Sequence, residues 1–134
     1  MDNNMYTELI LEHYRNPANF GTLKDCNLES YDENPICGDK IRMQFKISNN
    51  EIEEIKFSGD GCAICMSSAS MLTSHVKGMK LGEAKRVSKD DVFKLLGIEL
   101  TPVRIKCALL PLKVLKIAIV SFLEENKTVD WNSL

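Results

Sequence analysis

The feature that most constrains the fold is a short segment of alternating apolar and polar residues, followed at once by a turn. The alternation covers residues 41–47 and predicts a β-strand with one buried face. The residues on its apolar side are Ile41, Met43, Phe45 and Ile47. Asn49 and Asn50 come next, and asparagine tolerates the positive φ that a two-residue hairpin turn requires. The sequence therefore predicts an antiparallel hairpin here.

The returning strand of this hairpin is predicted over residues 51–57, with Ile55 and Phe57 facing the same side. Ile52 is out of phase with them, which indicates a bulge. A third short strand is predicted over residues 28–31. Strands that precede most of the helices and are joined by a hairpin are typical of an α+β domain. We therefore expect a small three-stranded antiparallel sheet covered on one face by helices.

Helical spacing of apolar residues predicts the remaining elements. They cover residues 4–15, 62–77, 89–96 and a final segment that ends near residue 123. Ser88 has the position of a helix cap, and Gly78 and Gly97 have the positions of helix ends. Proline is best tolerated in the first turn of a helix. Because of Pro111, we expect the final helix to begin just after Cys107.

Length and charge narrow the classes of function. The 134 residues fit one domain, covering residues 1–134, that is large enough to bury a core. With a formal net charge of -2, the chain has no excess of positive charge that would indicate nucleic-acid binding. The apolar stretch 112–123 contains two lysines and is too short to span a bilayer. Residues 1–4 offer no apolar secretory signal. We therefore expect a cytoplasmic protein with no nucleic-acid or membrane partner.

Five cysteines carry most of the chemical information in the sequence. Stable disulfides are not expected in a reducing compartment, and an odd number argues against complete pairing. Spaced cysteines in such a protein more often bind metal or carry sulfur. The alternative for each of them is a small buried apolar side chain. The local context of each cysteine has to decide between these readings.

Three of the cysteines lie where a loop meets a regular element. Cys37 lies in a Pro/Gly loop, with Asp39 two residues on. Cys62 lies where a glycine loop becomes a helix, whose free amides favour a thiolate. Cys107 is expected just before the final helix, beside Lys106, which also favours the thiolate. Three thiolates and one carboxylate suit zinc or a labile iron–sulfur cluster. The spacing alone leaves open whether they converge.

Four motifs follow one another along nearly the whole chain. They are EHYRNP at 12–17, NPICGD at 34–39, GC at 61–62 followed by SSAS at 67–70, and PVRIKC at 102–107. In their order and separation they resemble the NifU N-terminal family of iron–sulfur assembly proteins, whose branches include IscU and SufU. The resemblance implies a small sheet covered by helices, with the three cysteines at one exposed end.

The resemblance also implies a function. It is that of a scaffold, rather than an enzyme, that accepts sulfur from a cysteine desulfurase and assembles a transient 2Fe–2S cluster. The cluster is then passed to apo iron–sulfur acceptor proteins. Cys37, Cys62 and Cys107 would hold the cluster or a Zn²⁺ ion, with Asp39 as a further metal ligand. Cys37 and Cys107 are the candidate persulfide acceptors, since the two branches of the family differ in this respect.

The two branches leave an alternative open, which is a SufU-type zinc-dependent sulfurtransferase that carries persulfide. The chain resembles SufU in Lys106, which precedes the last cysteine, and in the sequence of residues 66–71. It resembles IscU in the short interval from Cys62 to Cys107. The segment 100–104 differs at two positions from the IscU segment that a dedicated chaperone recognises, so the sequence does not decide whether a chaperone binds here. A second alternative is a binding module with a structural zinc, which would unfold on chelation.

Cys65 departs from both branches of the family. With Cys62 it forms a C-A-I-C sequence at the start of a helix, and residues three apart lie on neighbouring faces. Cys65 is therefore a candidate to replace Asp39 as a ligand, to resolve a persulfide or to form a redox disulfide. The alternative is a buried cysteine that packs against the sheet. Cys26 has no counterpart, and we expect it to be structural. Lys106 and Arg104 are further candidates, because their charges would attract an anionic persulfide or a partner. The alternative for both is an ordinary solvated surface charge.

Overall fold

The structure, a computed structural model, describes residues 3–124 and 128–134. Its helices and strands, in chain order, are α1 (Asn3–Arg15), β1 (Leu28–Asn34), β2 (Asp39–Ser48), β3 (Glu51–Asp60), α2 (Ala63–Val76), α3 (Leu81–Lys85), α4 (Lys89–Leu96), α5 (Pro102–Phe122) and the short 3₁₀ helix η1 (Trp131–Ser133). Among the described residues, no helix has the length and apolar character needed to cross a membrane.

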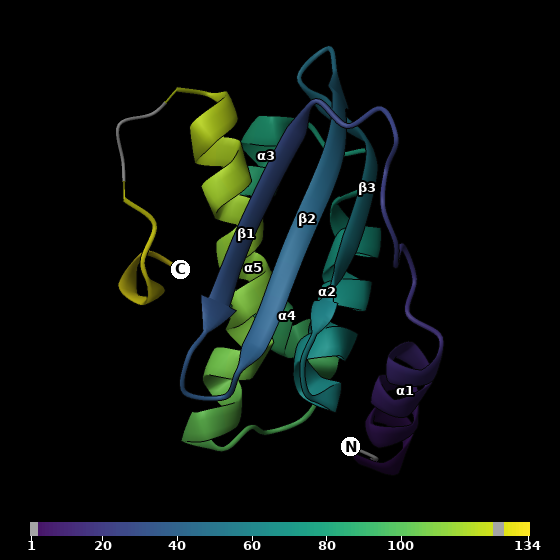
Figure 1. Cartoon of the computed structure of the whole chain (residues 1–134). Coiled ribbons are helices and arrows are strands. Elements are labelled where there is room, and N and C mark those ends of the chain that lie inside the picture. Colours follow the sequence, from purple (N-terminus) through teal and green to yellow (C-terminus); the bar gives the residue numbers. More distant parts are fainter. Residues whose placement is uncertain (1–2, 125–127) are drawn as a thin grey trace.

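The three strands form one antiparallel sheet in the order β1-β2-β3. Alternate residues of β2 are buried and exposed along its whole length. Figure 1 shows why: α2 and α5 lie behind the sheet, and its front face is uncovered. The structure therefore confirms the α+β prediction, a three-stranded antiparallel sheet covered on one face by helices.

The hairpin between β2 and β3 is built as the sequence predicts. Asn49 and Asn50 both have positive φ, of 54° and 58°. The pairing register shifts after Lys46, so that Glu53 is the extra residue of a bulge. This bulge reverses the phase of the strand and turns Ile52 into the core, where it is fully buried.

The central helix α2 is tied to its neighbours by serine hydroxyls. Ser67 Oγ donates to the carbonyl of Ile10 in α1 at 2.7 Å, and Ser68 Oγ donates to that of Ala108 in α5 at 2.6 Å. Both serines are buried, and small side chains let helices approach closely. This packing brings the start of α2, with Cys62, and the start of α5 to the same end of the sheet.

Two sequence predictions about elements were wrong, and one element was missed. Helix α5 begins at Pro102, and not after Cys107, because proline at the first helical position has its φ already set for a helix. Pro111 therefore lies inside the helix and deprives the Cys107 carbonyl of its N–H partner. The cost is offset by the many buried residues of α5. Strand β1 runs beyond residue 31, to Asn34, and α3 was not predicted.

Candidate metal and sulfur site

The lower end of the sheet in Figure 1 brings together three distant segments: the β1–β2 turn, the β3–α2 loop and the first turns of α5. Cys37 comes from the turn, Asp39 opens β2, and Cys107 lies in the second turn of α5. One ligand atom from each of these three side chains lies within 4.8 Å of the other two. The Cys107 Sγ donates to the Cys37 Sγ at 3.4 Å. Three of the four predicted ligands thus converge.

The β1–β2 turn is shaped to present Cys37. Gly38 has a φ of +76°, and its N–H donates to the carbonyl of Asn34 at 2.8 Å, which closes the turn. The Asn34 side-chain amide donates to the Cys37 Sγ at 3.4 Å. Cys37 is partly exposed, whereas Asp39 at the start of β2 is 3% exposed. The turn therefore places the partly exposed sulfur of Cys37 next to the buried carboxylate of Asp39.

The surroundings of the Asp39 carboxylate favour a bound cation. Its Oδ1 accepts from the backbone N–H of Cys62 at 3.3 Å. Its Oδ2 is buried and has no hydrogen-bond partner among the described residues. A buried carboxylate oxygen without a partner is costly, and a metal ion would satisfy it. With two thiols beside it, this oxygen completes a donor set that suits Zn²⁺ or iron.

Cys62 is linked to the site through its backbone and through Arg104. Cys62 is the N-cap residue of α2, and its sulfur is not among the three clustered ligand atoms. The exposed side chain of Arg104 lies near both thiols, and the charge of Cys62 is the main cause that raises the pKa of Arg104, followed by interactions with the thiols of Cys107 and Cys62. Arg104 therefore places a positive charge near both Cys62 and Cys107.

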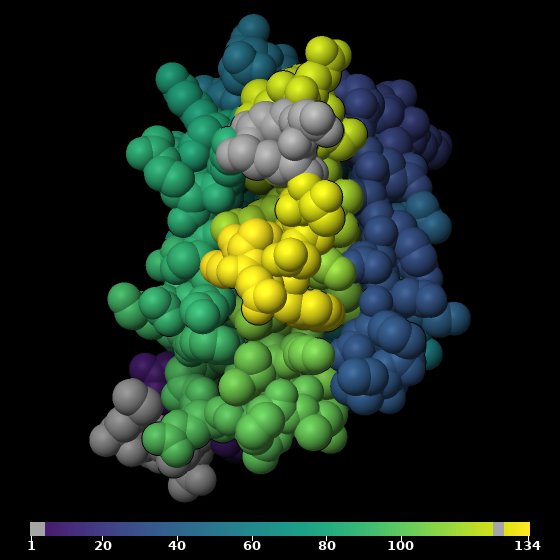
Figure 2. Space-filling view, turned by 90° about the vertical axis from the view of Figure 1, so that its left-hand side faces the viewer, coloured from purple at the N-terminus to yellow at the C-terminus, as the bar shows by residue number. Residues whose placement is uncertain are grey.

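The ammonium of Lys106 lies near an aromatic ring of the C-terminal segment. It lies 5.8 Å from the centre of the Trp131 ring, and Lys113 lies 4.8 Å from the same ring. Lys113 also pairs with Asp32 at 2.8 Å. Figure 2 shows the C-terminal segment that carries Trp131 lying over α5. The cation that lies near the thiols is thus Arg104, three residues before Cys107 and on the same face of the helix.

Burial opposes the thiolate that the sequence context of Cys107 predicted. Desolvation raises the pKa of Cys107, and its interactions with the Cys37 thiol and the Asp39 carboxylate raise it further. Desolvation likewise raises the pKa of Cys65, with the charge of Asp39 as the next cause. The expectation failed because it assumed that Cys107 lies in an exposed loop before the helix, whereas the side chain is fully buried.

Cys65 lies directly behind the site and Cys26 lies far from it. A Cβ atom added to Gly61 would lie 3.1 Å from the Cys65 Sγ and 3.3 Å from the Asp39 Cγ. Cys65 is fully buried. Cys26 precedes β1, at the end of that strand opposite to the Cys37 turn.

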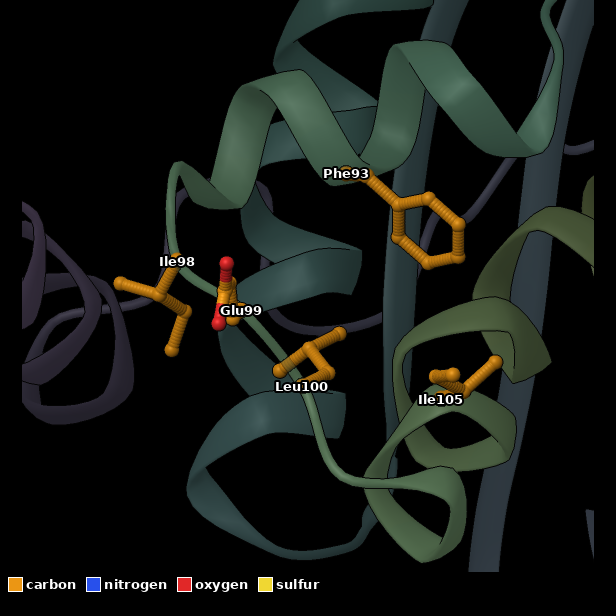
Figure 3. Close-up of a pocket in the computed structure, with 5 residues that line it drawn as sticks. All are labelled: Phe93, Ile98, Glu99, Leu100 and Ile105. Carbon is orange, nitrogen blue, oxygen red and sulfur yellow. The ribbon is translucent and has the colours of Figure 1, made fainter.

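Two cavities flank the start of α5. One of about 220 Å³ adjoins the site and is lined by Asn34, Ile36, Cys37, Pro102, Val103 and Lys106. The other, of about 340 Å³, is apolar and contains no site cysteine. Figure 3 shows its five lining residues, which come from α4, the α4–α5 loop and α5: Phe93, Ile98, Glu99, Leu100 and Ile105. The first cavity gives Cys37 an open approach beside the exposed side chains of Ile36 and Val103.

Known proteins are similar to this chain in sequence. The "Zinc-dependent sulfurtransferase SufU" of Bacillus subtilis is 37% identical over 129 residues, which cover 84% of this chain and 87% of that protein. The "Iron-sulfur cluster assembly scaffold protein IscU 1" of Archaeoglobus fulgidus is 34% identical over 126 residues, covering 94% and 82%. The scaffold protein IscU of Escherichia coli is 34% identical over 126 residues, covering 87% and 93%.

Solved structures agree in fold. A crystal structure of a hypothetical protein is 32% identical, with a TM-score of 0.77 over 88% of this chain and 98% of that one. The SufU protein of Fervidobacterium islandicum is 24% identical, with a TM-score of 0.74 over 89% and 99%. The family model described as "NifU-like N terminal domain" matches residues 5–129. The resemblance first read from the four motifs is thus confirmed, and the chain belongs to the NifU-like N-terminal domain family.

Proposed function

We propose that this chain is an iron–sulfur cluster assembly scaffold that acts as a single domain. The observation that carries the proposal is the convergence of Cys37, Asp39 and Cys107, where one oxygen of the buried Asp39 carboxylate has no hydrogen-bond partner in the part of the chain that the structure describes. The relatives named as scaffolds, at 34% identity over most of their length, support it.

In this proposal, Cys37, Asp39, Cys62 and Cys107 hold the metal or the growing 2Fe–2S cluster. The thiolates supply strong bonds to iron or zinc, and the bound metal draws sulfide into the cluster. Asp39 supplies the weaker oxygen ligand, which keeps the cluster transferable. Arg104 lies near the thiols of Cys62 and Cys107 and neutralises the negative charge that builds up as the thiols lose their protons.

Sulfur enters at Cys37. This sulfur is partly exposed beside the 220 Å³ cavity, whereas Cys107 is fully buried. A cysteine desulfurase is the donor, and its persulfide reaches Cys37 first. The separation of 3.4 Å between the two sulfurs then allows transfer to Cys107. Apo iron–sulfur proteins accept the finished cluster, and the reducing cytoplasm keeps the five thiols free.

The proposal is tested by anaerobic reconstitution with ferrous iron, L-cysteine and a cysteine desulfurase. We expect thiolate-to-iron charge-transfer absorption to develop, and then to pass to an apo-ferredoxin that is added. Cys37→Ser and Cys107→Ser should abolish it, whereas Cys26→Ser, the matched control far from the site, should leave it unchanged. Absence of the absorption in the wild-type chain would refute the scaffold function.

A zinc-dependent sulfurtransferase is the second candidate. The Bacillus subtilis relative bears this name, and the donor set of two thiols and one carboxylate suits zinc. This candidate predicts one zinc per chain and a desulfurase-dependent mass gain of one sulfur, with no cluster under the same reconstitution conditions. Zinc analysis and intact mass on one sample decide between the two functions.

A further inference from the structure

The proposed function does not use Cys65, although this side chain lies closest behind the site. Cys62 is the N-cap residue of α2 and is partly exposed. Cys65 is the third residue of the same helix and is fully buried. The pair therefore combines one sulfur that a donor can reach with one that solvent cannot.

The backbone brings these two residues close together at the start of α2. Residues three apart on a helix lie about 5–6 Å apart between Cβ atoms, and a disulfide requires about 3.5–4.5 Å, so the pair must close by roughly 1–2 Å to form one. The N-cap backbone of Cys62 is extended, with φ of -69° and ψ of 170°, so its side chain is free of the helical row. The carbonyl of Cys62 accepts from Met66, which fixes Cys65 in the first turn below it.

Gly61 keeps the space around the Cys65 sulfur open. A Cβ at this position would lie 3.1 Å from that sulfur and 3.3 Å from the carboxyl carbon of Asp39. The thiol of Cys65 thus lies under the ligand set, and the unpartnered Oδ2 of Asp39 is buried in the same place. A sulfur so enclosed is shielded from thiols in solution and can be reached only by groups already held at the site.

We propose that Cys65 is a resolving cysteine that reduces a persulfide carried on Cys62 to sulfide. The inference rests on the proposed sulfur-accepting function and adds Cys62, which is also partly exposed, as a second acceptor of sulfur beside Cys37. The Cys65 sulfur attacks the inner sulfur of the Cys62 persulfide, the S–S bond to the outer sulfur breaks, and a Cys62–Cys65 disulfide forms. The outer sulfur leaves with two electrons and, with the thiol proton of Cys65 and its own, becomes H₂S.

The step supplies what cluster assembly lacks. A persulfide sulfur must gain two electrons to become the sulfide of a cluster, and the two cysteine sulfurs provide them as they are oxidised to the disulfide. The chain performs this step once, and a dithiol reductant restores both thiols before Cys62 can act as a ligand again. No external reductant is consumed in the release of sulfide itself.

The test uses the full-length, metal-free, reduced chain and one equivalent of glutathione persulfide under anaerobic conditions. Released sulfide is measured with time, and the chain is then alkylated and digested with trypsin. Residues 57–77 form one tryptic peptide that contains Cys62 and Cys65 and no other cysteine. We expect sulfide release together with a 57–77 peptide that is lighter by two hydrogens and resists alkylation.

Cys65→Ser and Cys65→Ala should retain the added sulfur as persulfide and release sulfide at least ten-fold more slowly, whereas Cys26→Ser should behave as the wild type. A wild-type chain that keeps its persulfide, with both cysteines of the peptide open to alkylation, overturns the inference but leaves the scaffold function standing. A chain that takes up no sulfur, from this donor or from a desulfurase, overturns both. The wild-type result decides even if the Cys65 variants fold poorly.

Discussion

Replacing Asp39 by asparagine should stabilise the metal-free chain and weaken its hold on zinc. Asp39→Asn keeps the shape of the side chain and the acceptor for the Cys62 N–H, at 3.3 Å in the wild type. It removes a negative charge whose Oδ2 is buried without a partner. The neutral amide nitrogen that replaces Oδ2 can donate to the thiol sulfurs of Cys37 and Cys107 beside it. Relieving a buried polar group that has no partner is worth about 1–3 kcal/mol. For a chain of this length, each kcal/mol moves the melting temperature by roughly 3–5 °C.

Zinc should reverse this advantage. At a free zinc concentration of about 1,000 times Kd, binding stabilises the wild type by about 4 kcal/mol. If the variant binds about 100-fold more weakly, the same concentration yields only about 1.4 kcal/mol. Calorimetric melting with and without zinc therefore should show two effects of opposite sign. Asp60→Asn, at an exposed position at the end of β3, is the matched control and should change neither melting temperature. An Asp39→Asn chain with a lower metal-free melting temperature and an unchanged zinc shift would refute the reasoning.

Three further outcomes follow from the same geometry. Gly61→Ala should destabilise the chain and weaken zinc binding, because the added Cβ would lie 3.1–3.3 Å from atoms of Cys65 and Asp39. Gly82→Ala in α3 is the control: the space around Gly82 is open, and the change should stabilise the chain by about 0.5–1 kcal/mol. Thermal melts of the two variants check both outcomes. Arg104→Gln should slow sulfur transfer from a desulfurase more than Lys106→Gln does, since the Arg104 charge interacts with the thiols of Cys62 and Cys107 whereas the Lys106 ammonium lies near the Trp131 ring. Intact mass measured against time gives the two rates. Burial raises the pKa of Cys107, so its thiol is protonated at neutral pH and zinc must displace that proton. The affinity for zinc should therefore rise with pH, by about tenfold per pH unit for each proton released. Competition titrations between pH 6 and pH 8 measure this dependence.

Local signals in the sequence were sufficient for much of the fold. The Asn49–Asn50 turn and the bulge at Ile52 follow from the preference of asparagine for positive φ and from a break in strand phase. Ser88 was read as a helix cap, and its hydroxyl accepts from the Asp91 N–H in the structure. Each of these features depends on residues a few positions apart. For that reason no knowledge of the tertiary structure was needed to predict them.

The start of α5 shows where such reasoning failed. Pro111 was taken as a mark of the first turn, although Pro102 after Thr101 is the stronger signal for a helix start. The correct start places Arg104 and Cys107 three residues apart on one face, and Lys106 on another. The sequence analysis weighed both cations as groups that attract a persulfide, and without this helix start it had no reason to prefer Arg104. The burial of Cys107 and the unpartnered oxygen of Asp39 depend on long-range packing, which no local pattern encodes.

The central claim is that Cys37, Asp39, Cys62 and Cys107 form one metal site. X-ray absorption at the zinc edge of the zinc-loaded chain tests it most directly, because sulfur lies at about 2.3 Å and oxygen at about 2.0–2.2 Å from zinc. We expect three sulfur atoms and one oxygen atom bound to zinc, and loss of the oxygen in Asp39→Ala. Four sulfur atoms in the wild type, or the scattering pattern of a histidine ring, would contradict the account.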